Sequence, residues 1–202
     1  MLFRSRQSAI NAERLEKESV KAQYESLKNQ VNPHFLFNSL NALTNLVYED
    51  PDKAAKFIKQ LSEVYRYVLD SRSKELVSIT EELQFLQSYI FLQQIRFGDK
   101  LKMVIDLPNP TGEVAPLALQ LLIENAIKHN IIATDQPLTI QVYHQDGYFV
   151  VENDLQRKTV LSEDSSGLGL DNITKRYNFL SSVKVKIEES SSKFKVSIPV
   201  IS

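Results

Sequence analysis

Apolar residues recur at helical spacing through the N-terminal part of the chain. Three successive stripes advance by four, three and four residues, which is the spacing of a heptad seam. Their members are Val20, Tyr24, Leu27 and Val31, then Leu36, Leu40, Leu43 and Val47, then Phe57, Leu61, Val64 and Val68. Pro33 falls between the first two stripes and shifts their phase, which predicts a helix that is kinked there.

The third stripe predicts a second helix that starts at Asp50-Pro51, because a capping residue followed by proline is typical of a helix start. The connection is so short that the two helices should form an antiparallel hairpin. Two helices alone cannot enclose a core. We therefore expect a homodimer in which two hairpins form a four-helix bundle.

Beyond the hairpin the pattern changes to short strands and helices. A third helix is expected from Thr80 to Gly98, with Glu81 and Glu82 in its first turn, where negative charge is favourable. Two further helices, at Pro116–Asn130 and from Gly167 onward, accompany strands at Leu101–Leu107, Leu138–Tyr143, Tyr148–Val151, Val183–Ile187 and Phe194–Val200. We predict an α+β chain with a helical domain at residues 1–76 and, at residues 77–202, a mostly antiparallel sheet packed on about three helices.

Composition excludes several classes of protein. The chain has 202 residues, 43% apolar and 24% charged, which excludes a disordered tail and an integral membrane bundle. Its net charge of −1 gives no reason to expect nucleic-acid binding, and the absence of cysteine excludes a thiolate site. Residues 1–6 read MLFRSR, which fits both an ordinary soluble start and the cytoplasmic exit of a membrane helix.

His34 is the first candidate for chemistry. It lies roughly 200° around the helix from Leu36, on a face that it shares with Asn38, Asn41 and Asn45. This row is either a polar surface with a capping histidine or the setting of an accessible imidazole nucleophile.

Glu124 and Asn125 are the second candidate, because they interrupt an apolar helix, with Lys128 and His129 one turn on. Burial of unpaired polar groups is costly, so this edge faces either a ligand cavity or the rim of the sandwich. A carboxylate and a carboxamide oxygen are ligands that Mg²⁺ accepts.

The third candidate is the sequence GLGLDN at residues 167–172. Glycines at the opening of a helix allow backbone N–H groups to approach phosphate oxygens, although a plain loop-to-helix transition would read the same way.

Together these segments resemble one family. LytS-type sensor histidine kinases have a phospho-acceptor box similar to NPHFLFNSLN at residues 32–41, an N box similar to LQLLIENAIKH at residues 119–129, and a G box similar to GLGLDN followed by Arg176-Tyr177. The helix Leu83–Phe97, with Arg96, resembles the one between the first two boxes. The order and spacing of the boxes also match.

The resemblance implies a GHKL-type α/β sandwich that binds ATP and Mg²⁺. His34 would take the γ-phosphoryl group and pass it to an aspartate in the receiver domain of a response regulator, with Glu124 polarising the imidazole and Asn125 binding the metal. The remaining nucleotide-binding positions would be Lys128, His129, Asn153, Gly167, Gly169 and Leu170. It also implies a homodimer without direct nucleic-acid contact, the cytoplasmic portion of a bacterial inner-membrane protein attached through a segment N-terminal to this chain.

One motif departs from the family. Asn153 stands where the family has the aspartate that binds adenine, and Leu155 stands where it has a glycine. An amide accepts a hydrogen bond more weakly than a carboxylate does. Two alternatives therefore remain beside the kinase: a degenerate kinase that acts as a dimeric scaffold or phosphatase for its regulator, and a stand-alone ATPase.

Overall fold

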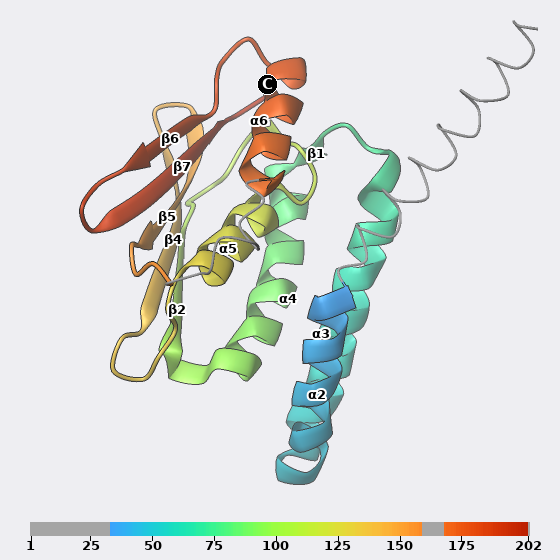
Figure 1. Cartoon of the computed structure of the whole chain (residues 1–202). Coiled ribbons are helices and arrows are strands. Elements are labelled where there is room, and N and C mark those ends of the chain that lie inside the picture. The colour runs from blue at the N-terminus through green and yellow to red at the C-terminus, as the bar shows by residue number, and fades with distance from the viewer. Residues whose placement is uncertain (1–32, 159–167, 202) are drawn as a thin grey trace, which may run out of the picture. The chain divides into compact units, whose positions relative to one another are not determined.

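The computed structural model describes residues 33–158 and 168–201 of the chain (Figure 1). It divides into two compact units, residues 1–41 and residues 42–202. Helix α2 (Pro33–Glu49) begins in the first unit and continues into the second. The predicted stripe over residues 20–31 lies outside the described residues.

The N-terminal hairpin consists of α2 and α3 (Pro51–Asp70), which are joined through the single residue Asp50. The Asp50 carboxylate caps α3, because its Oδ1 accepts a 2.9 Å hydrogen bond from the backbone N–H of Lys53. Helix α3 buries Phe57, Val64 and Val68 of its predicted stripe. The predicted start and apolar face of this helix are therefore confirmed.

The buried side of α2 differs from the prediction. Phe35, Ser39 and Leu46 are its buried positions, whereas Leu40 and Val47 of the predicted stripe are 45% and 47% exposed. The two sets are one residue apart, about 100° around the helix. Part of the apolar stripe thus remains in solvent in the single chain.

Helix α4 (Ile79–Phe97) follows a 3-10 turn (Ser71–Ser73) and the short strand β1 (Val77–Ser78). It begins one residue before the prediction, because the Ser78 hydroxyl accepts a hydrogen bond from the Glu81 N–H. It ends as predicted at Gly98, which has a φ of 57° and opens a second 3-10 turn (Gly98–Lys100). Helices α3 and α4 pack together, and the rings of Tyr67 and Phe85 stack with centroids 4.4 Å apart.

A five-stranded sheet forms the second layer, in the order β2-β4-β5-β7-β6. Strand β2 runs parallel to β4 and the other neighbours are antiparallel, which confirms the mostly antiparallel prediction. The strands are β2 (Leu101–Asp106), β4 (Leu138–Gln145), β5 (Tyr148–Asp154), β6 (Lys186–Glu189) and β7 (Lys193–Pro199). The short strand β3 (Glu113–Val114) pairs separately with β1.

Local turn chemistry explains two strand boundaries. Asp146 and Gly147, which join β4 to β5, both have positive φ, as a two-residue hairpin turn requires. Strand β6 begins later than predicted, because the residues before it form a turn in which the Val183 N–H donates to the Ser181 hydroxyl at 3.0 Å.

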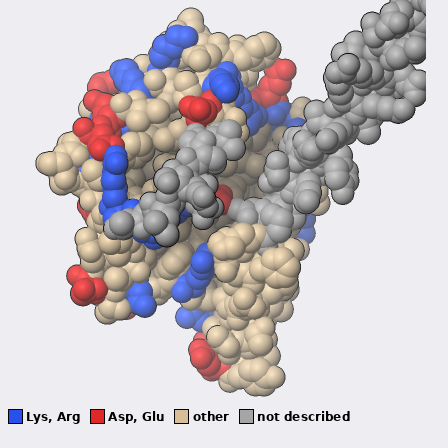
Figure 2. Space-filling view, viewed as in Figure 1, with Lys and Arg blue, Asp and Glu red and all other residues tan. Residues whose placement is uncertain are grey.

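Helices α4, α5 (Ala118–His129) and α6 (Leu168–Leu180) lie on one face of the sheet (Figure 1). Leu119 and Ile123 of α5 and Leu138 and Ile140 of β4 are fully buried between the layers. Lys and Arg side chains are spread over the visible surface with Asp and Glu among them (Figure 2).

Candidate active site

His34 lies at the start of α2 and is exposed. The amide nitrogen of Asn38, one turn further along, is 3.2 Å from each ring nitrogen of His34, so it can donate to whichever nitrogen is unprotonated. Asn41 and Asn45 are exposed as well, so the polar row predicted from spacing is present on this helix. His34 belongs to the first compact unit, whereas all the residues described below belong to the second.

Helix α5 carries four of the predicted site residues. Glu124 and Asn125 are half-buried in the middle of the helix, Lys128 is exposed, and His129 is half-buried in the last turn. Burial raises the pKa of the Tyr89 hydroxyl on α4, and the neighbouring Glu124 raises it further. The polar edge of α5 is therefore partly open to solvent, and Glu124 lies beside α4.

Cationic side chains gather around the C-terminal end of α5. Burial lowers the pKa of His129, and Lys128, Lys158 and Arg157 lower it further. Burial also lowers the pKa of Lys158, and the nearby Arg96 adds to this effect. Mutual repulsion among these groups makes the region a favourable place for an anionic ligand such as a polyphosphate.

The Lys158 side chain also caps the C-terminal end of α5. Its ammonium group donates to the carbonyl oxygens of Ile127 and Lys128 at 3.1 and 3.0 Å. The last carbonyls of a helix have no partner within the helix, and a cation is favourable beside them. The segment that leaves β5 is thereby attached to the helix that carries the N box residues.

Asn153 lies on the face of the sheet that the helices cover. It stands directly opposite Ile140 of β4 and is only 2% exposed. Its amide nitrogen donates a 2.6 Å hydrogen bond to the backbone oxygen of Asp154, so its carbonyl oxygen remains to accept one from a ligand. The neighbouring residue Asp154 points to the opposite face of the sheet, and its carboxylate pairs with Lys193 at 3.0 Å. Asp154 therefore does not take the place of the aspartate that the resembled family has at position 153.

The glycine motif is described only in part, because Gly167 lies outside the described residues. Gly169 and Leu170 lie in the first turn of α6. A Cβ atom built on Gly169 would meet no atom of a non-neighbouring described residue within 4 Å, so the described part of the chain leaves space beside it. A helix start with open space beside it can accommodate a phosphate.

The residues present fit a magnesium ion that is shared with a nucleotide. Among the described residues no three His, Asp or Glu side chains gather into a metal site. Mg²⁺ does not require one, because it keeps waters and takes phosphate oxygens together with one or two protein oxygens. The half-buried carboxamide of Asn125 offers such an oxygen.

Sequence reasoning missed the group that caps α5. Leu117 precedes this helix and has no side chain that can cap it, and Glu82 of α4 accepts hydrogen bonds from the N–H groups of Leu117 and Leu119 at 3.0 and 3.2 Å. We expected the Glu82 charge to interact with the first turn of its own helix, whereas its side chain is fully buried. The usable signal was the lack of Ser, Thr, Asp or Asn just before α5.

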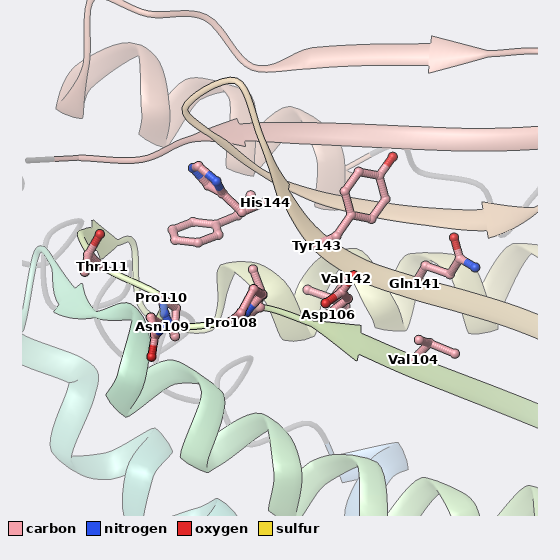
Figure 3. Close-up of a pocket in the computed structure, with 12 residues that line it drawn as sticks. Val104, Asp106, Pro108, Asn109, Pro110, Thr111, Gln141, Val142, Tyr143 and His144 are labelled. Carbon is pink, nitrogen blue, oxygen red and sulfur yellow. The ribbon is translucent and has the colours of Figure 1, made fainter.

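A cavity of about 530 Å³ lies beside the loop over residues 107–111, and its lining includes His144 of β4 and Phe149 of β5 (Figure 3). It is lined by Val104 and Asp106 of β2, by Gln141 and Tyr143 of β4, and by the loop over residues 107–111. None of the predicted site residues lines it. Among the described residues, the cavity thus shares no lining residue with the predicted nucleotide site.

Comparison with known proteins shows which family this chain resembles in sequence. The histidine kinase family model matches residues 22–101. The sensor histidine kinase YpdA of Escherichia coli is 40% identical over 59% of this chain and 21% of its own length. The sensor protein LytS of Staphylococcus haemolyticus is 31% identical over 95% of this chain and 36% of its own length. The LytS protein of Enterococcus faecalis is 32% identical over 77% of this chain and 29% of its own length.

Among solved structures, the histidine kinase AdeS of Acinetobacter baumannii superposes with a TM-score of 0.41 at 13% identity, over 78% of this chain and 83% of that one. At this score the superposition adds no weight to the assignment. The chain spans only about a fifth to a third of the curated relatives quoted above. In the part of the chain that the structure describes, no helix has the length and apolar character needed to cross a membrane. The family model and the identity to the LytS proteins establish that the chain belongs to the LytS-type sensor histidine kinases.

Proposed function

We propose that this chain is the catalytic core of a sensor histidine kinase, which transfers the γ-phosphoryl group of ATP to His34 and then to an aspartate in the receiver domain of a response regulator. The observation that carries the proposal is the exposed imidazole of His34 with the Asn38 amide 3.2 Å from its ring nitrogens. It lies within the segment that the family model matches.

The nucleotide would bind on the helix-covered side of the second unit. The carbonyl oxygen of Asn153 would accept a hydrogen bond from the adenine amino group, and the cations at the end of α5 would face the phosphates. Lys128 supplies part of that charge, and His129, whose pKa is lowered by burial and by the neighbouring cations, would contribute a neutral imidazole as a hydrogen-bonding group. Gly167, Gly169 and Leu170 would receive phosphate oxygens at the start of α6, where Gly169 leaves open space.

Asn125 would hold Mg²⁺ against the phosphates. The metal, when bound, neutralises charge that develops on the transferred group. In the transfer, a ring nitrogen of His34 forms a bond to the γ-phosphorus, the bond from this phosphorus to the β–γ bridging oxygen breaks, and ADP leaves. The carboxylate of Glu124 would take the proton released by the imidazole ring.

The assembly we propose is a homodimer through residues 1–76, with residues 77–202 as the ATP-binding domain. Exposed apolar side chains on both hairpin helices support it, among them Leu40, Val47, Ile58 and Leu69. We propose further that the chain is the cytoplasmic portion of a bacterial inner-membrane protein, attached through a segment N-terminal to it, with no direct contact to nucleic acid.

Incubation with γ-labelled ATP and Mg²⁺ tests the function. We expect acid-labile, base-stable label on the chain, and we expect His34→Gln to abolish it while nucleotide binding and helicity persist. His144→Gln is the matched control, because His144 is also exposed and should leave labelling unchanged.

The other outcomes identify the alternatives. Free phosphate without labelled protein would favour a stand-alone ATPase. If the incubation yields neither labelled protein nor free phosphate, the result would favour a scaffold or phosphatase for the regulator. Label that survives in His34→Gln would overturn the assignment of the acceptor.

A further inference from the structure

A fully buried carboxylate connects the hairpin to the helix that carries the proposed metal ligand. Glu82 of α4 has no exposed surface. It accepts three hydrogen bonds: from the Tyr67 hydroxyl of α3 at 2.6 Å, from the Leu117 N–H at 3.0 Å and from the Leu119 N–H at 3.2 Å. Its partners are therefore distributed over α3 and the start of α5.

The bonds to Leu117 and Leu119 determine where α5 begins. Leu117 has a φ of 64°, a left-handed conformation that is costly for a residue with a branched side chain. An ordinary N-cap residue would satisfy the first N–H groups of the helix, and a leucine cannot do so. When Glu82 is ionised, its negative charge also lies at the positive end of the α5 dipole, which is favourable. This carboxylate thus acts as the cap of a helix to which it does not belong.

The hydrogen bond from the Tyr67 hydroxyl connects α3 to the same Glu82 carboxylate. The Tyr67 ring stacks on Phe85, one turn of α4 beyond Glu82, which holds the hydroxyl in place. A shift of α3 along α4 would have to break this hydrogen bond or carry Glu82 with it. Hydrogen bonds to a buried charged group are among the stronger ones in proteins.

Helix α6 holds the residues just before α5. The Arg176 guanidinium donates to the carbonyl oxygen of Pro116 at 3.0 Å, and the Ala115 N–H donates to the Tyr177 hydroxyl at 3.2 Å. The start of α5 is therefore fixed by side chains from two helices, α4 and α6, and Tyr67 of α3 bonds to one of these side chains, Glu82.

We propose that Glu82 is a positioning residue that sets the start of α5, and with it the location of Asn125, relative to α3. On the proposed function, on which this inference rests, the Tyr67–Glu82 bond couples the hairpin to the nucleotide site. A change in the position of α3 alters the α5 cap, and nucleotide bound along α5 alters the position of α3 in return, because coupling between two sites is reciprocal.

The first arm of the test is hydrogen exchange of the full chain without nucleotide. Glu82→Gln should speed exchange at the Leu117 and Leu119 amides by about tenfold, because an amide side chain cannot accept all three bonds. The Leu121 amide, which donates to the Leu117 carbonyl within the helix, is the internal reference. Unchanged protection at Leu117 and Leu119 would overturn the capping role.

The second arm uses Tyr67→Phe, which keeps the ring stacked on Phe85 and removes only the hydroxyl donor. We expect the rate of His34 labelling at saturating ATP to fall by about tenfold while the Kd for ATP stays within about twofold. Tyr65→Phe is the matched control, because the Tyr65 hydroxyl is buried without a hydrogen-bond partner among the described residues.

The two arms separate this inference from the proposed function. A wild-type chain that takes no label would refute the kinase proposal, and the exchange arm would still decide the role of Glu82. An unchanged labelling rate in Tyr67→Phe would refute the coupling even if the kinase proposal holds. If Glu82→Gln fails to fold, Tyr67→Phe alone decides.

Discussion

The side-chain carbonyl of Asn130 accepts a 2.7 Å hydrogen bond from the backbone N–H of Gln156. Asn130 follows the last residue of α5, and its amide nitrogen also donates to the Ala126 carbonyl at 2.9 Å. The Ile131 N–H donates in return to the Gln156 carbonyl at 2.7 Å. The end of the N box helix and the segment that leaves β5 are thereby fixed to one another.

Asn130→Ala should destabilise the fold by about 1–3 kcal/mol, because it removes both side-chain hydrogen bonds at a buried position and leaves the backbone N–H of Gln156 without its acceptor. Urea unfolding measures the change. Asn45→Ala, at an exposed position on α2, is the control and should lie within about 0.5 kcal/mol of the wild type. Equal stability of both variants would contradict the role given to Asn130.

Asn125→Ala should remove the part of ATP affinity that depends on Mg²⁺ and should abolish His34 labelling, while the chain stays folded. The reason is that a half-buried amide oxygen on α5 is the proposed protein ligand of the metal. Calorimetry with ATP, with and without Mg²⁺, checks it. An Asn125→Ala chain whose ATP affinity still rises with Mg²⁺ to the wild-type degree would exclude this ligand.

Asn153→Asp should tighten ATP binding by about 1 kcal/mol, because a carboxylate accepts the hydrogen bond of the adenine amino group more strongly than an amide does. GTP, which carries a carbonyl at the corresponding ring position, is the control ligand and should gain nothing. Titration calorimetry on both proteins provides the measurement. The same affinity for ATP before and after the substitution would place adenine elsewhere.

The pH dependence of stability should report the burial of Glu82. Burial raises its pKa from the usual 4.5 to about 7, against the opposing effect of its hydrogen bonds and of Arg176. Between those values the folded chain holds a proton that the unfolded chain has lost. This group therefore makes the free energy of unfolding fall as pH rises, by about 1.4 kcal/mol per pH unit, with no further change well above pH 7.

Urea unfolding of the wild type and of Glu82→Gln at several pH values between 5 and 8 isolates this contribution. The difference in stability between the two proteins should shift in favour of the glutamine variant as pH rises. Tyr67 and Tyr177, which also face Glu82, have pKa values raised by burial and stay neutral throughout this range. A difference that does not change with pH would contradict the assignment.

The exposed stripe on the hairpin should mediate the proposed dimer. Val47→Lys should weaken self-association, because it places a charge on an apolar position that is 47% exposed in the single chain. Sedimentation equilibrium measures the effect. Val104→Lys, at a similarly exposed site on β2, is the control and should leave association unchanged.

Local chemistry in the sequence by itself determined most of the secondary structure. Asp50 and Pro51 mark a helix start because a side-chain cap and a fixed φ act over a few residues. Asp146 and Gly147 mark a hairpin because both can adopt positive φ. The polar row that begins at His34 also follows from helical spacing alone, since the row needs no partner from elsewhere in the chain.

Tertiary structure decided which polar groups act together. Glu82 reads as an ordinary residue in the first turn of its own helix, yet its partners lie 15, 35 and 37 residues away. The buried side of α2 likewise depends on which neighbours pack against it, and spacing alone predicted a face one residue away. Asn153 is directed toward the helix layer by its register with β4. Contacts of this kind form only when distant segments pack against each other, because the periodicity of one segment specifies a face but not what covers it.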